Sequence, residues 1–199
     1  NWTNPSRVRR CCGTPTGPAQ IVLSGWAARV RILADGRRQV LSFVLPGELI
    51  GYCHQVRPLA VSTVLAVTPV QTCMAPAAIL SSRLQQAYAV SGALEESYLL
   101  SQITRLGRLN AQERLCDFLL EMHERLSQIG LTRSGSFECP LSQETLSDVL
   151  GLTPVHVNRM LQQVRRQDDI EWRGRRVTIK DPAALAAKLG RVPVRVQSA

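Results

Sequence analysis

The chain has 199 residues, of which 45% are hydrophobic, so it can bury a substantial core and is not globally disordered. No stretch approaches the roughly eighteen consecutive apolar residues of a transmembrane helix, and no secretory signal is recognisable, so we expect a cytoplasmic protein with no membrane partner. The formal net charge of +9 favours a partner that carries phosphate, with nucleic acid ahead of an anionic membrane surface.

The cysteines are not spaced like a metal site or a disulfide framework. No CxxC pair occurs, which argues against a zinc finger and against a small secreted scaffold. Most of the thiols are therefore predicted to be buried small hydrophobic groups in a reducing compartment. The six positions are Cys11, Cys12, Cys53, Cys73, Cys116 and Cys139.

Residues 1–76 are predicted to form a β-rich first domain. Strand-like runs cover residues 20–33, 37–45, 62–70 and 71–75, and the turn sequences ADGR and PGE separate some of them. Glycine in ADGR supplies the positive φ that a hairpin turn needs. Short strands at regular intervals indicate a small sandwich or barrel.

Residues 77–129 are predicted to be helical. Apolar residues recur there at a spacing of three and four, and Gly92 or Gly107 is a candidate break. A second helix, NAQERLCDFLLEMHERLSQIG, has Asn110 as a cap and Glu113 three residues later. The apolar stripe of the first helix either packs on the β region or pairs with a second copy of the chain. The residues predicted for this dimer contact are Leu94, Tyr98, Leu99, Ile103 and Leu106.

Residues 130–199 are predicted to form a third domain. A strand over 136–141 precedes a helix over 142–151 that ends at glycine, and LTPVHVNRMLQQVRRQ follows as a second helix. The sequence DIEWRGRRVTIKD is predicted to form a hairpin, and residues 181–190 a last helix. The tail after residue 190 is expected to be loose.

The helix within LTPVHVNRMLQQVRRQ has one face for a protein core and one for a partner. Val157, Met160, Leu161 and Val164 share the buried face. A helix, a tight glycine turn, a second helix and a basic hairpin together predict a winged helix-turn-helix whose second helix enters the major groove of DNA. An ordinary helical hairpin with a solvated face is the alternative.

The residue types on the second face suit base and phosphate contacts. Arginine pairs with guanine, asparagine with adenine or phosphate, and valine can contact a thymine methyl group. His156 lies beside this face and is expected to be solvated or to contact phosphate. The residues predicted to contact DNA are Ser142, Gln143, Thr153, Val155, His156, Asn158, Arg159, Gln162, Arg173, Arg175 and Arg176. No enzyme is expected, because the three histidines fall in three different regions and no catalytic signature is visible.

LSQETLSDVLGLTPVHVNRMLQQVRRQDDIEWRGRRVTI resembles the winged helix-turn-helix of the CRP/FNR family of bacterial transcription regulators. VLSGWAARVRILADGRRQVLSFVLPGELIG resembles the cyclic-nucleotide-binding-like β-roll of that family, and NAQERLCDFLLEM resembles the segment after its dimerisation helix. The likeness covers roughly residues 20–190. It implies an α+β fold, a homodimer on a roughly palindromic site, RNA polymerase as a partner, and an effector or redox signal sensed in the β-roll.

The chain departs from the family at named positions. Val155 stands where the best-known members have a base-reading Glu, so we expect a different operator. Asp168 and Asp169 replace a Gly–apolar pair before the wing, which is expected to strain that turn. Residues 1–18 do not resemble the first strands of the family, so the β-roll is either truncated or remodelled there. The opening segment has no Met, which leaves open whether the natural N-terminus is included.

The effector site departs further. Tyr52 and Val61 stand where cyclic-nucleotide-binding members have Glu and Arg, so cAMP is not expected. Cys11 and Cys12 do not match the cysteine spacing of iron–sulfur members. Cys53 and His54 leave haem or another metal as an option. An unidentified small molecule, a redox-sensitive thiol, or a vestigial, ligand-free sensor serving a DNA-binding dimer or a protein-interaction module are the alternatives. The candidate effector residues are Gly47, Glu48, Cys53, His54, Ser62 and Thr63.

Overall fold

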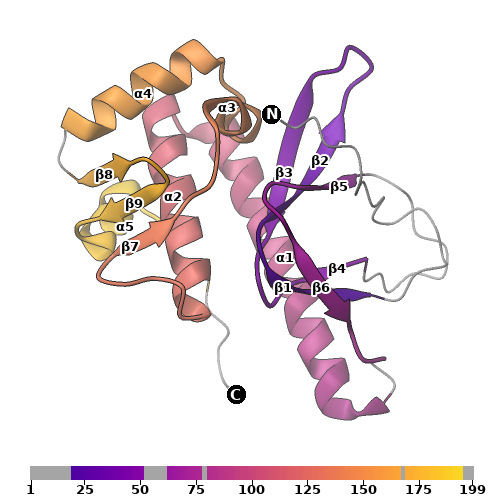
Figure 1. Ribbon diagram of the computed structural model, residues 1–199. Coiled ribbons are helices and arrows are strands. Elements are labelled where there is room, and N and C mark those ends of the chain that lie inside the picture. Colours follow the sequence, from indigo (N-terminus) through magenta and orange to yellow (C-terminus); the bar gives the residue numbers. More distant parts are fainter. Residues whose placement is uncertain (1–18, 52–61, 78–79, 167–168, 195–199) are drawn as a thin grey trace. The chain divides into compact units, whose positions relative to one another are not determined.

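The computed structural model describes residues 19–51, 62–77, 80–166 and 169–194 (Figure 1). Within these residues, antiparallel sheets and five α-helices confirm the predicted α+β class. The chain divides into two compact units, residues 1–99 and 100–199, and the division falls inside the long helix α1, Ser82–Arg108. Each unit is described by itself below.

The first unit contains two three-stranded antiparallel sheets. One has the order β4-β1-β6 and the other the order β3-β2-β5. The strands are β1 Gln20–Ser24, β2 Ala27–Ile32, β3 Arg38–Val44, β4 Leu49–Ile50, β5 Thr63–Ala66 and β6 Gln71–Met74. An apolar cluster forms the core, with Val22, Ala27, Val44, Ile50 and Val64 all buried. Short strands in two sheets agree with the predicted small sandwich or barrel.

The predicted strand over 20–33 is wrong in one respect, because Gly25 divides it. Residues before the glycine belong to β1 and residues after it to β2, in different sheets. Gly25 has φ +84°, and a Cβ built on it would lie 2.1 Å from the backbone oxygen of Pro69. Only glycine fits both the conformation and this close approach. The sheet change therefore depends on a contact with a residue far along the chain.

Helix α1 is longer than predicted, because a glycine within it was expected to mark a break. It runs unbroken over 27 residues, so neither Gly92 nor Gly107 marks a break. The part of α1 up to Leu99 belongs to the first unit, where Glu95 Oε1 forms an ion pair with Arg29 Nε at 2.9 Å. The Tyr88 hydroxyl donates to the Pro76 carbonyl. These two polar contacts tie this part of α1 to the first unit.

The second unit is built around α2, Ala111–Gln128. Asn110 caps it by accepting from the backbone N–H groups of Gln112 and Glu113, and the Glu113 side chain accepts from the Asn110 N–H, which confirms the predicted capping box. Helix α2 packs against three of the helices that follow it, α3, α4 and α5, and against one strand of a sheet with the order β7-β9-β8. These elements are α3 Gln143–Leu150, α4 Pro154–Arg166, α5 Pro182–Leu189, β7 Ser136–Glu138, β8 Ile170–Arg173 and β9 Arg176–Ile179.

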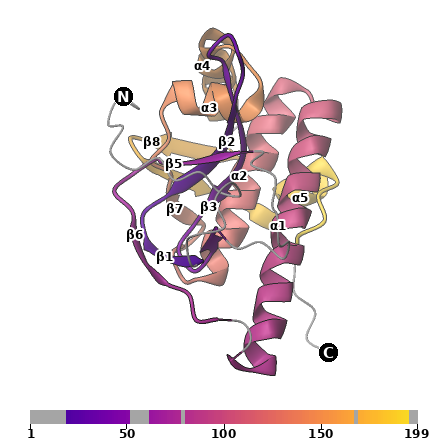
Figure 2. The ribbon, with the colours of Figure 1, turned by 90° about the vertical axis from the view of Figure 1, so that its right-hand side faces the viewer.

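Figure 2 shows the last turns of α1 beside α2, where the two helices are joined by side-chain contacts described below. The tail beyond α5 was expected to be loose, but its first residue is held in place. Arg191 is docked on α2, with its side chain only 5% exposed, so the tail is not loose at this point. No helix of the described residues is long and apolar enough to cross a membrane.

Candidate nucleic-acid interface

Helix α3 begins at a cap that leaves part of its N-terminus open to a partner. The Ser142 hydroxyl accepts from the Thr145 backbone N–H at 3.1 Å, and Ser142 has the extended backbone typical of a cap. Gln143, the first residue of the helix, is exposed. A helix N-terminus carries partial positive charge and free N–H groups, so this end suits a phosphate.

The turn between α3 and α4 is sharp because of Gly151. Its backbone is left-handed, at φ 63° and ψ 36°, and its N–H donates to the Ser147 carbonyl. The Leu152 N–H donates to the same carbonyl at 3.2 Å. This is the glycine end that the sequence predicted, and it turns the chain within three residues into α4.

Helix α4 has the two faces that the sequence predicted. Its apolar face is buried, with Val157, Met160, Leu161 and Val164 at most 8% exposed. Thr153 caps its start by accepting from the His156 N–H at 3.3 Å. The residues predicted to touch DNA lie on the opposite side and are exposed: Thr153, Val155, His156, Asn158, Arg159 and Gln162.

The exposed face offers both charged and apolar groups. Val155 is 80% exposed, which is a large apolar surface for a single residue in water. The Gln162 amide donates to Asn158 Oδ1 at 3.1 Å, so these side chains are paired along the helix. Arg159 forms no hydrogen bond or ion pair within the described part of the chain. Its guanidinium is therefore available to a ligand.

The hairpin of β8 and β9 carries the exposed arginines Arg173, Arg175 and Arg176. Gly174 turns it with φ +59°, and the Trp172 indole donates to the Gly174 carbonyl at 3.0 Å. Within the described residues, Arg173 and Arg175 form exposed, loose ion pairs, at 3.3 Å to Glu171 and 4.0 Å to Glu138. Because such pairs contribute little, both arginines can turn to a phosphate.

The acidic pair before the hairpin lies partly within the described residues. Asp168 falls outside them. Asp169 pairs with Lys188 of α5 at 3.1 Å, and its carbonyl accepts from the Lys180 N–H at 3.0 Å. The carboxylate thus has a partner inside the unit, which accounts for an acidic residue beside a basic hairpin.

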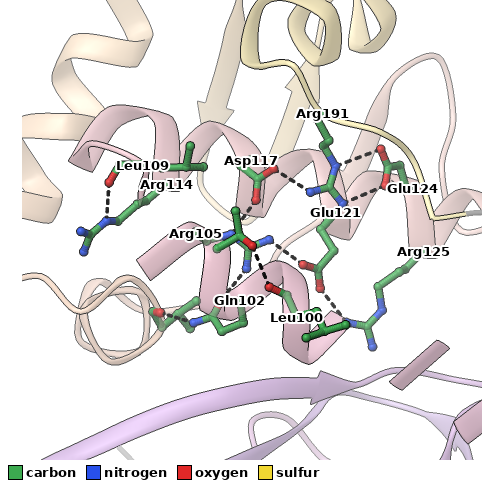
Figure 3. Close-up of polar contacts among 12 residues, drawn as sticks. Leu100, Gln102, Arg105, Leu109, Arg114, Asp117, Glu121, Glu124, Arg125 and Arg191 are labelled. Atoms are coloured by element: carbon green, nitrogen blue, oxygen red, sulfur yellow. Dashed lines mark hydrogen bonds and ion pairs between the residues drawn. The ribbon is translucent and has the colours of Figure 1, made fainter. Parts of the chain in front are cut away.

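Behind the interface lies a buried ionic cluster that the sequence analysis missed (Figure 3). Arg105 of α1 is 2% exposed and uses all of its nitrogens: Nε lies 2.7 Å from Asp117, Nη2 lies 2.6 Å from Glu121, and Nη1 donates to the Gln102 amide oxygen. Its guanidinium carbon also lies 5.7 Å from the centre of the Phe118 ring.

The cluster extends from α2 to the chain's tail. Arg125 Nη1 lies 3.0 Å from Glu121, while Arg191 lies 2.6 Å from Asp117 and 3.0 Å from Glu124. Burial disfavours the charged form of Arg191, but its contacts with Glu124 and Asp117 outweigh this and raise its pKa above the usual value. The cluster comprises the cations Arg105, Arg125 and Arg191 and the anions Asp117, Glu121 and Glu124.

A sequence signal for this cluster existed. Asp117, Glu121 and Arg125 follow one another at a spacing of four on α2. They therefore share a face of the helix, and every residue from Leu115 to Met122 is buried. Charges inside such a stretch require buried partners, because an unpaired buried charge is strongly unfavourable.

The predicted dimer residues differ in exposure. Ile103 is 66% exposed, Leu94, Leu99 and Leu106 are partly buried, and Tyr98 is only 7% exposed in the single chain. Leu100, which was not among the predicted residues, is 57% exposed on the same helix.

The candidate effector residues are only partly within the described chain. Gly47 occupies a turn at φ +88°, and the Glu48 carboxylate accepts from the Leu45 N–H of that turn at 3.0 Å. Ser62 and Thr63 are half-buried at the start of β5. Cys53 and His54, the candidate haem or metal ligands, lie outside the described residues. The described residues contain no group of three or more side chains that could hold a metal ion.

The chain matches known proteins over most of its length. Residues 13–87 match the model of the cyclic nucleotide-binding domain, and residues 113–188 match that of the Crp-like helix-turn-helix domain. The nitrogen fixation regulation protein FixK of Bradyrhizobium diazoefficiens is 31% identical over 170 residues, which cover 83% of this chain and 71% of FixK. FixK of Rhizobium meliloti is 32% identical over 183 residues, 88% of this chain and 76% of that protein.

A solved structure shows the same fold. The structure of FixK2 from Bradyrhizobium japonicum has a TM-score of 0.73 and 26% identity, and the match covers 95% of this chain and 98% of FixK2. The helix-turn-helix match spans α2 through nearly all of α5, so the capped turn, the exposed face of α4 and the basic hairpin all lie within it.

Proposed function

Because the chain belongs to the CRP/FNR family of bacterial transcription regulators, and is therefore a regulator with a helix-turn-helix DNA-binding domain rather than an enzyme, we propose that it binds a roughly palindromic DNA site as a homodimer. The single observation that carries this proposal is the exposed face of α4, where Arg159 has no partner within the described residues and Val155 is 80% exposed. It acts in the cytoplasm, where its DNA lies.

The exposed face of α4 supports a specific mode of base reading. A free guanidinium can donate two hydrogen bonds to guanine, which assigns that role to Arg159. Asn158 has its amide oxygen engaged by Gln162, so its amide nitrogen is left to donate to a base or a phosphate acceptor. Val155 contacts a thymine methyl group in place of the hydrogen bond that a Glu would make, so the preferred site differs from that of Glu-bearing members.

Phosphate contacts hold this helix in register. Ser142, Gln143 and the first N–H groups of α3 face one phosphate, with Thr153 and His156 at the start of α4 beside the groove. Arg173, Arg175 and Arg176 of the hairpin hold the neighbouring backbone. These contacts carry no sequence information but make binding strongly dependent on salt.

The dimer forms through α1. Leu100 and Ile103 are exposed at a spacing of three residues, and Gly107 follows four residues later, where a small residue permits close approach of a second helix. The partly buried Leu94, Leu99 and Leu106 flank this seam, while Tyr98 has little surface left for a partner. Ile103→Asp is expected to convert the dimer to a monomer in sedimentation equilibrium, and an unchanged dimer would place the contact elsewhere.

An effector or redox signal at the β-roll controls the dimer, and RNA polymerase is the partner through which it acts on transcription. The match of residues 13–87 to the cyclic nucleotide-binding domain supports a sensor. One observation favours the alternative of a ligand-free sensor. The Glu48 carboxylate, a candidate effector contact, already accepts a hydrogen bond from the Leu45 N–H of its own turn. An absorption spectrum of the purified protein tests haem or an iron–sulfur cluster, and calorimetry with cyclic nucleotides tests a nucleotide effector.

The central test is a selection of duplexes from a random DNA pool, followed by affinity measurements on the selected site at several salt concentrations. We expect a palindromic site whose affinity falls steeply with salt. Arg159→Ala should relax discrimination at one base position per half-site by about 1–3 kcal/mol, whereas Arg176→Ala should weaken binding to all sequences and lower the salt slope by about one. If Arg159→Ala left base preferences unchanged, the reading assignment would be wrong.

A further inference from the structure

The side chain of Gln102 connects two parts of the second unit. It lies on the last turns of α1 and is 6% exposed. Its amide nitrogen donates to the Val149 carbonyl of α3 at 2.7 Å, and its amide oxygen accepts from Arg105 (Figure 3). Both ends of one amide are thus used, one on α3 and one on the ionic cluster.

The carbonyl that Gln102 binds belongs to a special part of α3. The last four carbonyls of a helix have no partner within the helix, so they need one from elsewhere. Gln102 takes the Val149 carbonyl, and Arg114 of α2 donates to the next one, that of Leu150, at 3.1 Å. The end of α3 is therefore held by side chains from α1 and α2.

The direction in which the recognition helix α4 leaves α3 is set at this end of α3. Gly151 follows directly, and a Cβ built on it would lie 3.3 Å from Leu106 Cδ2 of α1. The turn thus packs closely against the same turns of α1 that present Gln102. The direction of α4 consequently depends on α1, although 47 residues separate Gln102 from Val149 in the sequence.

We infer that Gln102, held in place by Arg105, is a positioning residue that fixes the start of the recognition helix relative to α1. This inference rests on the proposed function, because it concerns how two recognition helices reach two half-sites. In a dimer joined through α1, an error in the angle between α1 and α4 is repeated in both protomers and misaligns the two helices with their half-sites.

The ionic cluster gives Gln102 its fixed geometry. The Arg105 guanidinium is planar, and its three nitrogens are committed to Asp117, Glu121 and Gln102. The two carboxylates belong to α2, so the amide of Gln102 is oriented by α2 while it holds α3. A side chain free to change rotamer would not transmit a fixed angle.

The test compares two substitutions of Gln102 in the full chain. Gln102→Met removes both hydrogen bonds at similar volume. Gln102→Glu keeps an acceptor for Arg105 but cannot donate to the Val149 carbonyl. Gln86→Met, on the exposed face of the same helix, is the matched control. Affinity is measured for a palindromic duplex selected by the wild-type protein and for a duplex that carries one half-site of it, with the dimer checked by sedimentation.

Both Gln102 variants are expected to lose about tenfold in affinity for the palindrome, the size of effect that one hydrogen bond per protomer can have, with little change on the single half-site. Gln86→Met should match the wild type on both duplexes. Equal losses on both duplexes, or wild-type palindrome affinity for Gln102→Glu, would overturn the inference. Failure of the wild-type protein to select any palindrome would overturn the proposed function instead, so the two failures are distinct.

Discussion

Each of the two units of the chain has its own core, and the two cores differ in kind. In the described part of the first unit the core cluster is apolar, formed by Val22, Ala27, Val44, Ile50 and Val64. The second unit adds to its apolar core four buried charged residues of α1 and α2. These are Arg105, Asp117, Glu121 and Arg125.

The difference concerns geometry more than stability. Apolar contacts are non-directional, so an apolar core tolerates small shifts of its elements. A buried ion pair adds little net stability, because desolvation offsets the attraction, but its distances and angles are fixed and breaking it is costly. The unit that matches the helix-turn-helix domain is therefore the one with directional buried contacts.

The largest predicted effect breaks the ionic cluster. Asp117→Ala leaves the guanidinium groups of Arg105 and Arg191 short of their shared partner, at 2.7 and 2.6 Å respectively. We expect a loss of about 3–5 kcal/mol in the free energy of unfolding, because an uncompensated charge then stays buried. Urea denaturation followed by circular dichroism measures it.

Glu95→Ala in the first unit is the matched control. It removes the partner of Arg29 from a pair in which the Glu95 side chain is 40% exposed, so water can replace the lost contact. We expect a loss of no more than about 1 kcal/mol. If Glu95→Ala proved as damaging as Asp117→Ala, the contrast between the two units would be incorrect.

The next largest predicted effect is a difference between the two units in the reactivity of their thiols. Burial raises the pKa of Cys116 to about 11 and that of Cys139 to about 12, so both thiols stay protonated near neutral pH. Cys73 in the first unit is exposed on β6. With iodoacetamide at pH about 8, Cys73 should be modified at least about a hundredfold faster than Cys116 or Cys139, because the thiolate is the reactive form.

Mass spectrometry of peptides at timed intervals gives the three rates, and equal rates in denaturant provide the control. Fast labelling of Cys116 or Cys139 in the native protein would show that the second unit opens readily. Most cysteines were predicted to be buried: Cys116 and Cys139 are buried, Cys73 is exposed, and Cys11, Cys12 and Cys53 lie outside the described residues.

Local features were predictable from the sequence because their causes lie within a few residues. The caps at Asn110 and Ser142, the glycine turn at Gly151 and the buried face of α4 all follow from neighbours three or four positions apart. Each of them also lies in the candidate interface or beside it. The exposed face of α4 could therefore be predicted residue by residue.

Long-range contacts could not be predicted in the same way. Arg191 meets Asp117 across 74 residues, and Gly25 is required by the backbone of Pro69. No pattern in the neighbouring sequence distinguishes a docked arginine from a solvated one in a basic tail. The hydrogen bond between Gln102 and Val149 is of the same kind, because 47 positions separate the two residues, and the sequence did not predict it.

The smallest predicted effect is a pH dependence confined to the second unit. Burial lowers the pKa of His123 below its ordinary value of 6.5, although the negative charge of Glu124 acts in the opposite direction and raises it. The His123 ring packs on the Phe137 ring, with their centres 6.1 Å apart. A histidine with a lowered pKa in the folded state binds its proton more readily when unfolded. Its contribution to stability is therefore complete above pH 6.5 and is lost as the pH falls through the lowered value.

Urea denaturation at pH about 7.5 and about 5.5 should show a modest loss of stability on acidification, smaller than either effect above. His123→Gln should reduce that loss, because glutamine does not titrate. His156→Gln, on the exposed face of α4, should leave it unchanged. An acid loss that persisted fully in His123→Gln would show that His123 is not its origin.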